Sequence, residues 1–584
     1  MPHVARTATP PATGRSAIWR LVRPYWVSDQ KWVALGLLAA IVVLNLGMVY
    51  INVRLNAWNR DLYDVLQARD FAQFKSLLWQ FSWLAFIFIA VAIYSVYLRQ
   101  ALQIRWRYWM SERYMDRWLA HRAYYRIEQD PARHQADNPD QRIAEDLNAL
   151  TSDTLTLVLG FISSSVTLLS FVHILWTVSG PVSLAAFGHA WSVPGYMVWF
   201  AVLYAIVGSG LVWWIGRPLV GLNFAQERLE ANFRFGLIRV REHAEAVALY
   251  RGERQERVQL GSRLDAIRDN WRAIMGVTKR LNVAVNLYGQ FAVIFPMLVS
   301  APRYFSGAIS LGVLMQISNA FGQVQDALSW FINAFTTLAS WKASVNRLAG
   351  FNADVERAAA MADGSAIEVR REAGSALVIN ALALALPDGS PLLQPFSARL
   401  ESGEHILVSG PSGCGKSTLV RAIADLWPYG SGRIALPARA DIMFLPQRSY
   451  LPVGSLRAAL SYPTAEGSFD DDLITRYLGL CRLAHLAARL DQAANWSQAL
   501  SPGEQQRLAF VRVFLNRPAL VCLDEATSAM DGEAEAAMYA ALPRELPGVT
   551  VLSIAHRETV ARFHSMRWQF VPQPQGCRVE ALPL

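Results

Sequence analysis

The chain has 584 residues, of which 53% are hydrophobic and only 17% are charged, with a formal net charge of +9. That length allows about two to four domains, and the apolar fraction is too high for an ordinary soluble enzyme. A positive charge can indicate nucleic-acid binding. Here, however, the excess arginines and lysines flank apolar segments on one side, a pattern that sets the orientation of membrane spans. No nucleic-acid partner is therefore predicted.

Residues 1–30 are predicted to be an N-terminal cytosolic segment without a signal peptide, because no short apolar region with a cleavage site follows directly. Residues 31–350 are predicted to form a membrane domain with six spans, each about 20 residues long. From Thr154 to Gly216 there is no Asp, Glu, Lys or Arg, which leaves room for two spans. The six spans are placed at 33–53, 77–98, 155–178, 196–216, 281–300 and 311–338.

The charged connections predict the orientation of these spans. Residues 99–153 and 217–280 are rich in arginine, whereas the connections 179–195 and 301–310 carry only Arg303. Positively charged loops stay in the cytosol, so both termini and both long loops are predicted to be cytosolic in a multi-pass plasma-membrane protein. The long loops are too charged for lipid and are predicted to continue spans two to five as helices beyond the bilayer.

Two stretches in these loops carry helix signals. Asn138-Pro139-Asp140-Gln141 suits an N-cap, a proline at the first helical position and a capping box closed by Gln141. The stretch 242–252 places Glu242 and Glu245 on one helical face. From their pattern alone, both stretches could equally be solvated helix surface.

Two spans carry polar side chains at helical spacing. Such groups are costly at bilayer depth, so they face protein or a water-filled cavity. Hydrogen bonding between helices is the alternative for any one of them. The number of polar residues favours a substrate cavity, lined by Gln316, Asn319, Gln323 and Asp326 of span six and by Asn282, Asn286 and Gln290 of span five.

After a predicted linker at 351–372, residues 373–584 are predicted to form a nucleotide-binding domain. A buried strand leads into a G-x-x-x-x-G-K-[ST] phosphate-binding loop, and a helix follows it. The glycines let the backbone N–H groups face a polyphosphate, Lys416 pairs with the β- and γ-phosphates, and Ser417 ligates Mg²⁺. The nucleotide-binding loop residues are Gly410, Pro411, Ser412, Gly413, Cys414, Gly415, Lys416, Ser417 and Thr418.

Later motifs complete this site. A strand ends in Asp524, a metal ligand, and Glu525, which can polarise the attacking water. Gln447 could touch both Mg²⁺ and that water, and His556 could hydrogen-bond the γ-phosphate. All four cysteines lie in this C-terminal third, which predicts a reducing, cytosolic compartment and no disulfide framework.

These motifs resemble those of an ABC half-transporter, with a membrane domain fused ahead of its ATPase domain. They are Walker A (410–418), the Q-loop Gln447, the signature (500–505), Walker B (520–525), the D-loop (528–531) and the switch His556. The loop stretches 138–141 and 242–252 are similar to those of the BacA/SbmA-like importers and the related peroxisomal acyl-CoA transporters. The resemblance implies an α-helical six-span transmembrane domain of the ABC exporter type, followed by an α/β P-loop domain, with the two loop tips as coupling helices.

Two positions depart from the family pattern. Pro502 and Glu504 replace residues of the usual Leu-Ser-Gly-Gly-Gln signature, but Ser501 suits an N-cap, Pro502 the first helical position and Glu504 a capping box. The expected phosphate donors, the Ser501 hydroxyl and the Gly503 N–H, remain. Residues 382–388 offer no aromatic side chain for adenine, so adenine is expected to rest on apolar groups, with loose nucleotide preference.

The resemblance implies ATP and Mg²⁺ as cofactors and a homodimer with two composite ATP sites. The leading hypothesis is ATP-driven movement of a hydrophilic solute, similar to cobalamin or a peptide, inward across the plasma membrane. A second is export of acyl-CoA or lipid, which the polar stripes oppose. A third is a nucleotide-gated channel or sensor, which the presence of Glu525 and His556 opposes.

Overall fold

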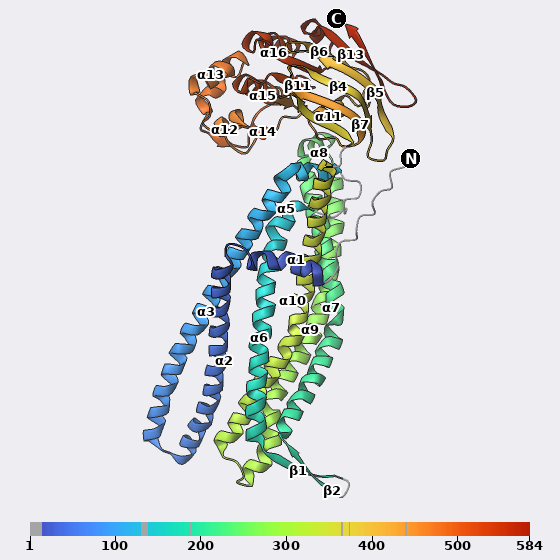
Figure 1. Cartoon of the computed structure of the whole chain (residues 1–584). Coiled ribbons are helices and arrows are strands. Elements are labelled where there is room, and N and C mark those ends of the chain that lie inside the picture. The colour runs from blue at the N-terminus through green and yellow to red at the C-terminus, as the bar shows by residue number, and fades with distance from the viewer. Residues whose placement is uncertain (1–14, 130–137, 187–188, 364–365, 373, 439–440) are drawn as a thin grey trace. The chain divides into compact units, whose positions relative to one another are not determined.

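The computed structural model describes residues 15–129, 138–186, 189–363, 366–372, 374–438 and 441–584. It divides into two compact units (Figure 1). The first, a membrane unit, comprises residues 1–115 and 138–351, and the second, an ATPase unit, comprises residues 116–137 and 352–584.

The membrane unit consists of long helices (Figure 1). Five helices of the described residues are long and apolar enough to cross a membrane, and these five contain the first five predicted spans. The sixth predicted span lies in α10, which is not one of those five but is a single continuous helix. The elements are α1 (Arg15–Trp26), α2 (Lys31–Ala68), α3 (Phe71–Leu119), α5 (Pro139–Gln141), η2 (Arg142–Asp146), α6 (Leu147–Ser179), α7 (Tyr196–Glu242), α8 (Ala244–Tyr250), α9 (Glu253–Phe305) and α10 (Leu311–Asp363).

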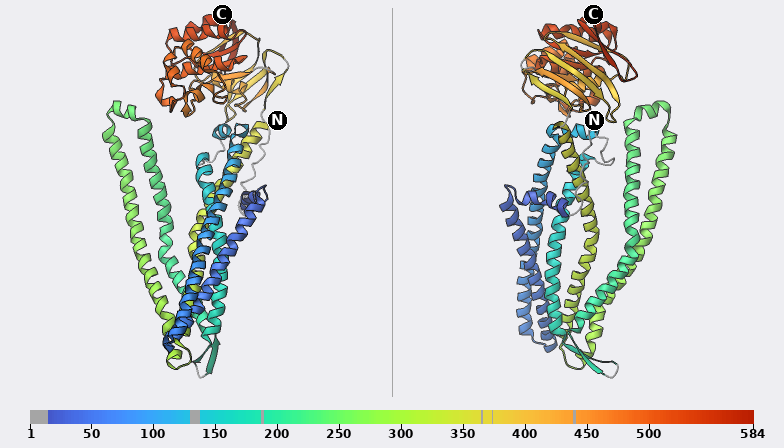
Figure 2. Two further views of the ribbon diagram at one scale, coloured as in Figure 1. Left: turned by 90° about the vertical axis from the view of Figure 1, so that its left-hand side faces the viewer. Right: turned by 45° about the vertical axis from the view of Figure 1, so that its right-hand side comes forward.

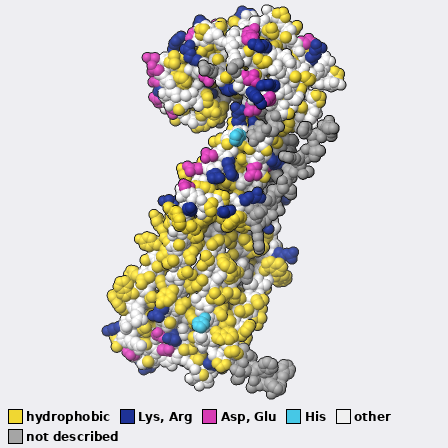
Figure 3. Space-filling view, in the orientation of Figure 1, with side chains coloured by type: hydrophobic (Ala, Val, Ile, Leu, Met, Phe, Trp, Pro, Cys, Tyr) yellow, Lys and Arg dark blue, Asp and Glu magenta, His cyan; other side chains and the backbone are white. Residues whose placement is uncertain are grey.

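Large apolar side chains cover much of the outside of these helices. Figure 3 shows them as a broad yellow band, with Lys and Arg concentrated beyond one edge. Residues such as Phe86, Leu169 and Trp214 are more than two-thirds exposed, which suits contact with lipid rather than water. The chain is therefore a membrane-spanning protein.

The α7–α9 pair forms a hairpin whose end near β1 and β2 joins the bundle and whose α8 end lies apart from the other helices of the unit (Figure 2). At the joined end, an apolar core contains Phe171 and Leu175 of α6, Met197 of α7 and Phe321 of α10. The short α8 closes the tip of the hairpin. The prediction that spans two to five continue as helices through the charged loops is confirmed, since α3, α6, α7 and α9 all extend well past the apolar segments.

The connection between spans three and four is a β-hairpin, which was expected to be only a short loop. Strands β1 (Pro181–Ala186) and β2 (His189–Pro194) pair antiparallel between Gly180 and Gly195. Both glycines have φ near +60° (+62° and +61°), a conformation that residues with a Cβ rarely adopt. The glycines therefore allow the chain to turn out of α6 and into α7.

The helix start at Asn138 is confirmed, but its predicted capping box is absent. Asn138 makes no side-chain cap hydrogen bond, and the Gln141 Nε2 donates instead to Glu145 Oε2 at 3.0 Å. A π-helical turn follows, in which Arg142 and Asp146 form a buried ion pair. The side chain of Gln141 therefore hydrogen-bonds to a residue of the next helical turn and does not cap the N–H groups at the start of the helix.

The ATPase unit contains two principal sheets. A six-stranded sheet has the order β14-β13-β6-β12-β11-β8, with a parallel core, and a four-stranded sheet has the order β3-β7-β4-β5. Figure 1 shows α11 near these sheets. The strands are β3 (Ile367–Glu372), β4 (Leu377–Ala385), β5 (Pro391–Leu400), β6 (His405–Ser409), β7 (Gly430–Pro437), β8 (Ile442–Leu445), β9 (Gly454–Ser455), β10 (Ala493–Ala494), β11 (Leu520–Asp524), β12 (Thr550–Ile554), β13 (Met566–Val571) and β14 (Arg578–Pro583).

A helical subdomain lies between β8 and β11 in the chain. Its core joins Tyr477, Trp496 and Phe514, all 1% exposed or less. The helices of the unit are η1 (Ala120–Arg122), α4 (Ala123–Gln129), α11 (Lys416–Ile423), α12 (Leu456–Ser461), α13 (Asp471–Leu480), η3 (Ala484–Arg489), α14 (Trp496–Ala499), α15 (Pro502–Asn516), α16 (Gly532–Glu545) and η4 (Glu558–Phe563).

The predicted linker at 351–372 differs from the structure. Residues 351–363 continue α10, and residues 367–372 form β3, which pairs with β7. The polar composition after residue 351 was read as a linker, but it belongs to the soluble end of a long helix. The four cysteines are all free and buried.

Candidate functional site

The Walker loop follows β6 and leads into α11. Gly410, Gly413 and Gly415 have φ values of +144°, +83° and +86°, so the backbone curls as predicted. A Cβ on Gly410 would lie 2.7 Å from the Phe570 carbonyl oxygen, which excludes larger residues there. Lys416 folds back over the loop, and its Nζ donates to the carbonyls of Gly410 and Pro411, both at 2.8 Å.

The predicted metal ligands lie together at the carboxyl ends of the parallel strands. The Ser417 Oγ donates to Asp524 Oδ1 at 2.8 Å. Burial raises the pKa of Asp524, while the hydrogen bond from Ser417 opposes that rise and the nearby Glu525 adds to it. A partly buried carboxylate beside a hydroxyl is a suitable ligand pair for a hard cation such as Mg²⁺.

Glu525 lies between the other two predicted catalytic residues. Its Oε2 accepts a hydrogen bond from Gln447 Nε2 at 2.8 Å, and its Oε1 lies 3.0 Å from His556 Nε2. Glu525 has φ +51°, which is rare for a residue with a side chain. Strain of this kind clusters at functional sites, and here it turns the carboxylate away from the strand toward Gln447 and His556.

The signature helix begins as the sequence predicted. Ser501 is the N-cap of α15, Pro502 is its first residue, and the capping box with Glu504 is complete. Ser501 N donates to Glu504 Oε2 at 2.9 Å, and this hydrogen bond lowers the pKa of Glu504. The hydrogen bonds described for Ser501 are to Glu504, within the signature helix itself.

Gln506 is a site residue that sequence reasoning missed. Its Oε1 accepts from the Ala529 N–H at 2.9 Å, and its Nε2 donates to Ser528 Oγ at 3.1 Å and to the Gln447 carbonyl at 3.4 Å. The side chain is 4% exposed. Gln506 thus joins the signature helix to the D-loop and the Q-loop. The only feature of the sequence that could have indicated this role is its position two residues after Glu504, on the buried face of α15.

A second missed group connects the D-loop to the segment after His556. The carboxylate of Glu535, 2% exposed, accepts from Thr527 Oγ1 at 2.6 Å and lies 3.3 Å from Arg557 Nη1. The same Arg557 nitrogen donates to the Met530 carbonyl at 2.9 Å. The D-loop is therefore held in place by Gln506 through Ser528 and Ala529, and by Arg557 through Met530.

The residues present fit a nucleotide with Mg²⁺. A curled loop of N–H groups, one lysine and the N-terminus of α11 can bind phosphate oxygens. Within the described ranges, no cluster of three or more His, Cys, Asp or Glu could hold a metal alone, so Ser417 and Asp524 would share Mg²⁺ with phosphate oxygens, as this ion commonly requires. The expected adenine region is the turn after β4, where Leu386 is 39% exposed and offers an apolar surface.

Residues 116–129 of the first long loop belong to the ATPase unit and pack against the residues that follow α11. Arg122 Nη1 donates to the carbonyls of Ala424 and Asp425, which directly follow α11. Arg126, 7% exposed, donates to the Asp425 carbonyl at 3.3 Å and lies 3.6 Å from its carboxylate. The predicted coupling tip was 138–141; the contact described here is made by η1 and α4, earlier in the chain.

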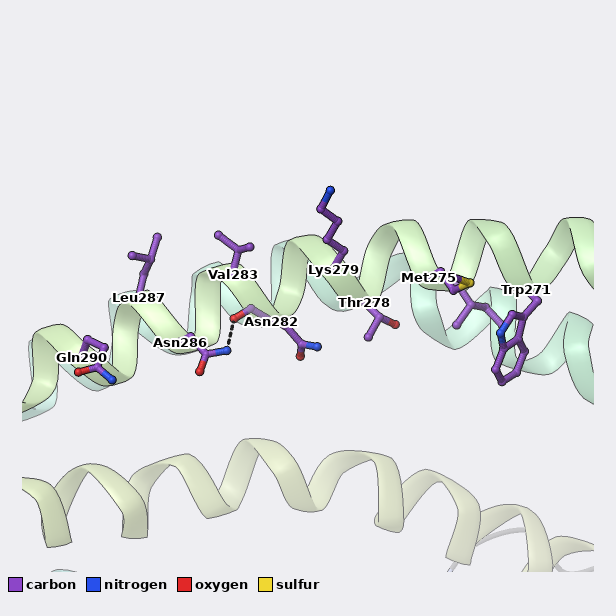
Figure 4. A pocket seen from close by; sticks show the side chains of 10 residues that line it. Trp271, Met275, Thr278, Lys279, Asn282, Val283, Asn286, Leu287 and Gln290 are labelled. Atoms are coloured by element: carbon purple, nitrogen blue, oxygen red, sulfur yellow. Dashed lines mark hydrogen bonds between the residues drawn. The ribbon is translucent and has the colours of Figure 1, made fainter.

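The membrane unit has a pocket of about 920 Å³ along α9. Asn282, Asn286 and Gln290 line it, and Figure 4 shows their side chains on one side of the helix, with Asn286 Nδ2 donating to the Asn282 carbonyl at 2.7 Å. Val283 and Leu287 also line the pocket; in Figure 4 their side chains point to the side of α9 opposite the three amides.

The predicted stripe of α10 does not contribute to the lining described for this pocket. Asn319 and Asp326 are exposed and Gln323 is half-buried. Gln316 is 5% exposed and packs against α2, where its carbonyl accepts from Asn56 Nδ2 at 3.3 Å. This bond uses the backbone carbonyl, and the side-chain Oε1 of Gln316 is buried without a hydrogen-bond partner in the described part of the chain. Gln316 is thus packed against α2, while its side chain makes no described hydrogen bond to that helix.

Residues 21–305 match the family described as ABC transporter transmembrane region 2, and residues 393–528 match the ABC transporter family. The inner membrane ABC transporter ATP-binding protein YddA of Escherichia coli is 33% identical over 92% of this chain and 94% of its own length. The chain belongs to the ABC transporter family. It is an ATP-hydrolysing half-transporter, with a membrane domain fused to an ATPase domain.

Two further proteins resemble this ABC transporter. The human lysosomal cobalamin transporter ABCD4 is 27% identical over 94% of this chain and 93% of its own length. The structure of a bacterial Atm1-family ABC exporter with ATP bound has a TM-score of 0.69 and 18% identity, covering 95% of each chain. The predicted ABC exporter-type fold is confirmed by this likeness.

Proposed function

We propose that this ABC transporter acts as a homodimer that moves a hydrophilic solute, similar to cobalamin or a peptide, inward across the plasma membrane with both termini in the cytosol. The carrying observation is the row of amides from Asn282, Asn286 and Gln290 along one pocket. Amides can hydrogen-bond a neutral polar solute without demanding a charge. The similarity to a cobalamin transporter favours the same class of solute.

The ATPase residues have separate roles in the proposed cycle. Glu525 polarises the attacking water, and His556 and Gln447 hold that carboxylate in place. Bound ATP supplies the γ-phosphoryl group whose transfer to water drives the cycle. We infer that Ser501 and Gly503 complete the ATP site of a second copy, as the resemblance to ABC half-transporters implies.

Coupling to the membrane unit can be followed from α11. Asp425 lies just after that helix and binds Arg126, so a movement of α11 on nucleotide binding would reach the loop that continues α3. We propose that this contact carries the closing motion toward the spans. In α8, Leu249 and Tyr250 are 77% and 87% exposed, so the tip of the α7–α9 hairpin presents an apolar surface.

A second candidate is transport of acyl-CoA or a lipid. Trp271, Ile274, Met275, Val283 and Leu287 also line the pocket, and an apolar chain could lie along them. The amide row opposes this reading, because an acyl chain would leave those groups without hydrogen bonds.

The test is ATPase activity of the full chain in nanodiscs, with cobalamin, a proline-rich peptide and an acyl-CoA titrated separately. The proposal predicts that cobalamin or the peptide stimulates turnover, that Asn286→Leu abolishes stimulation while basal turnover remains, and that Val285→Leu, a neighbour outside the pocket lining, keeps both. Stimulation by the acyl-CoA alone would establish the second candidate. Glu525→Gln should remove turnover in every condition.

A further inference from the structure

Arg303 is half-buried and makes no ion pair with a described residue, at the end of the membrane unit that carries β1 and β2. It lies near the end of α9, one turn past the apolar span. Its Nη1 is buried and has no hydrogen-bond partner among the residues that the structure describes. The guanidinium lies over the turn that ends α6, since a Cβ on Gly180 would be 3.0 Å from Nη2 and 3.1 Å from Nη1. A buried, unpaired cationic donor is costly.

No ion pair between Arg303 and a carboxylate is found among the residues that the structure describes. Residues 154–216, which include the end of α6, the β-hairpin and the start of α7, contain no Asp or Glu. The carboxylates of the first connection have other partners. Asp61 pairs with the arginine before it, while Asp64 and Asp70 accept backbone N–H groups.

Three buried hydroxyls occupy the same helix ends. The hydroxyl oxygens of Ser179, Tyr196 and Ser300 are buried, and none has a hydrogen-bond partner in the described part of the chain. Their residues are 0%, 3% and 0% exposed. Ser179 directly precedes Gly180, and Ser300 lies one helical turn before Arg303 on α9. Tyr196 opens α7 and belongs to the apolar core of α6, α7 and α10, against which Val299 of α9 packs.

We propose that the outer ends of α6, α7 and α9 form a binding site for a phosphate group. Arginine presents a fork of donors that matches phosphate oxygens, and hydroxyl groups supply further donors of adjustable direction. The site lies where span five ends, at the depth of lipid headgroups. Its occupant is therefore either the phosphate of an outer-leaflet anionic lipid or a free phosphate from the external medium.

Two experiments on the full-length protein in a maltoside detergent, which contains no phosphate, test this proposal. In the first, thermal unfolding is followed as inorganic phosphate replaces chloride at constant ionic strength. In the second, native mass spectrometry measures retention of phosphatidylglycerol. Arg303→Gln should weaken binding in at least one experiment by about tenfold or more, as the loss of a charge-assisted pair implies. The matched control is Arg69→Gln, another outer arginine, which is exposed.

The outcomes separate the two sources. A shift with inorganic phosphate identifies a free anion, and retention of phosphatidylglycerol without that shift identifies a lipid headgroup. Arg303→Lys, which keeps the charge but loses the fork, should bind more weakly than the native protein and more tightly than Arg303→Gln. Equal behaviour of the native protein and Arg303→Gln in both experiments, or an equal loss in Arg69→Gln, would overturn the proposal.

Discussion

Gln506→Leu should uncouple the three motifs that meet around Gln506 while leaving the Walker loop intact. The substitution orphans the Ala529 N–H and removes the bonds to Ser528 and Gln447. Ala529 and Ser528 are exposed, so water can replace their lost partner; each lost neutral bond costs about 1 kcal/mol, and we expect a total loss of about 3 kcal/mol in the ATPase unit. The larger effect should be kinetic, because misplacing a positioned group by about 1 Å can cost about 100-fold in rate.

The assay is steady-state ATPase activity in nanodiscs, together with thermal unfolding. Asn516→Leu is the matched control, because Asn516 lies on the same helix outside the signature and makes two side-chain hydrogen bonds, to the Arg512 carbonyl and with Thr464 Oγ1; neither partner belongs to the D-loop or the Q-loop. Both variants should lose stability, yet only Gln506→Leu should lose about tenfold or more in kcat, with a smaller change in KM for ATP. Equal kcat values in the two variants would refute the reasoning that Gln506 positions the D-loop.

Three further predictions concern stability. Glu504→Ala should cost about 1 kcal/mol, because the capping box with Ser501 is lost. The pKa of Glu504 is lowered in the folded state, so this difference in stability from the native protein should be present at neutral pH and should disappear as the pH falls below the ordinary range of Glu. Thermal melts at several pH values measure it. Burial lowers the pKa of His564 to about 4. The unfolded chain therefore binds a proton at His564 before the folded protein does, and the fold should lose up to about 3 kcal/mol of stability as the pH falls from about 6.5 to 4. His564→Phe should flatten that part of the plot of unfolding temperature against pH. Gly180→Ala should lower the unfolding temperature, because φ is +62° there and the new methyl would meet the Arg303 guanidinium; an unchanged melt would contradict that reasoning.

The nucleotide site could be predicted closely because its motifs are local. A glycine-rich loop between a strand and a helix, or a capping box at Ser501, depends on neighbours in sequence. The contacts of Gln506 and Glu535 could not be predicted in this way, since each joins segments that are distant in the chain and neither residue stands out by type. The same applies to Arg126, whose partner Asp425 lies about 300 residues later.

The membrane unit shows where helical periodicity stops being informative. Spacing placed Gln316 on the same face as Asn319, and it could not distinguish a residue buried against α2 from one that is exposed. Polar composition likewise suggested a linker after residue 351, although a helix that leaves the bilayer becomes polar without ending. The β-hairpin at 181–194 was missed because its two strands are short and apolar, like the spans on either side.

The most direct test of the proposed function is ATP-dependent movement of labelled cobalamin in proteoliposomes. External ATP drives only those molecules whose ATPase units face the medium, and for these the liposome lumen corresponds to the outside of the cell. An importer should therefore release preloaded cobalamin into the medium when ATP and Mg²⁺ are added, and Glu525→Gln should release none. Accumulation of cobalamin in the lumen, or equal release by the native protein and Glu525→Gln, would contradict the proposal of ATP-driven import.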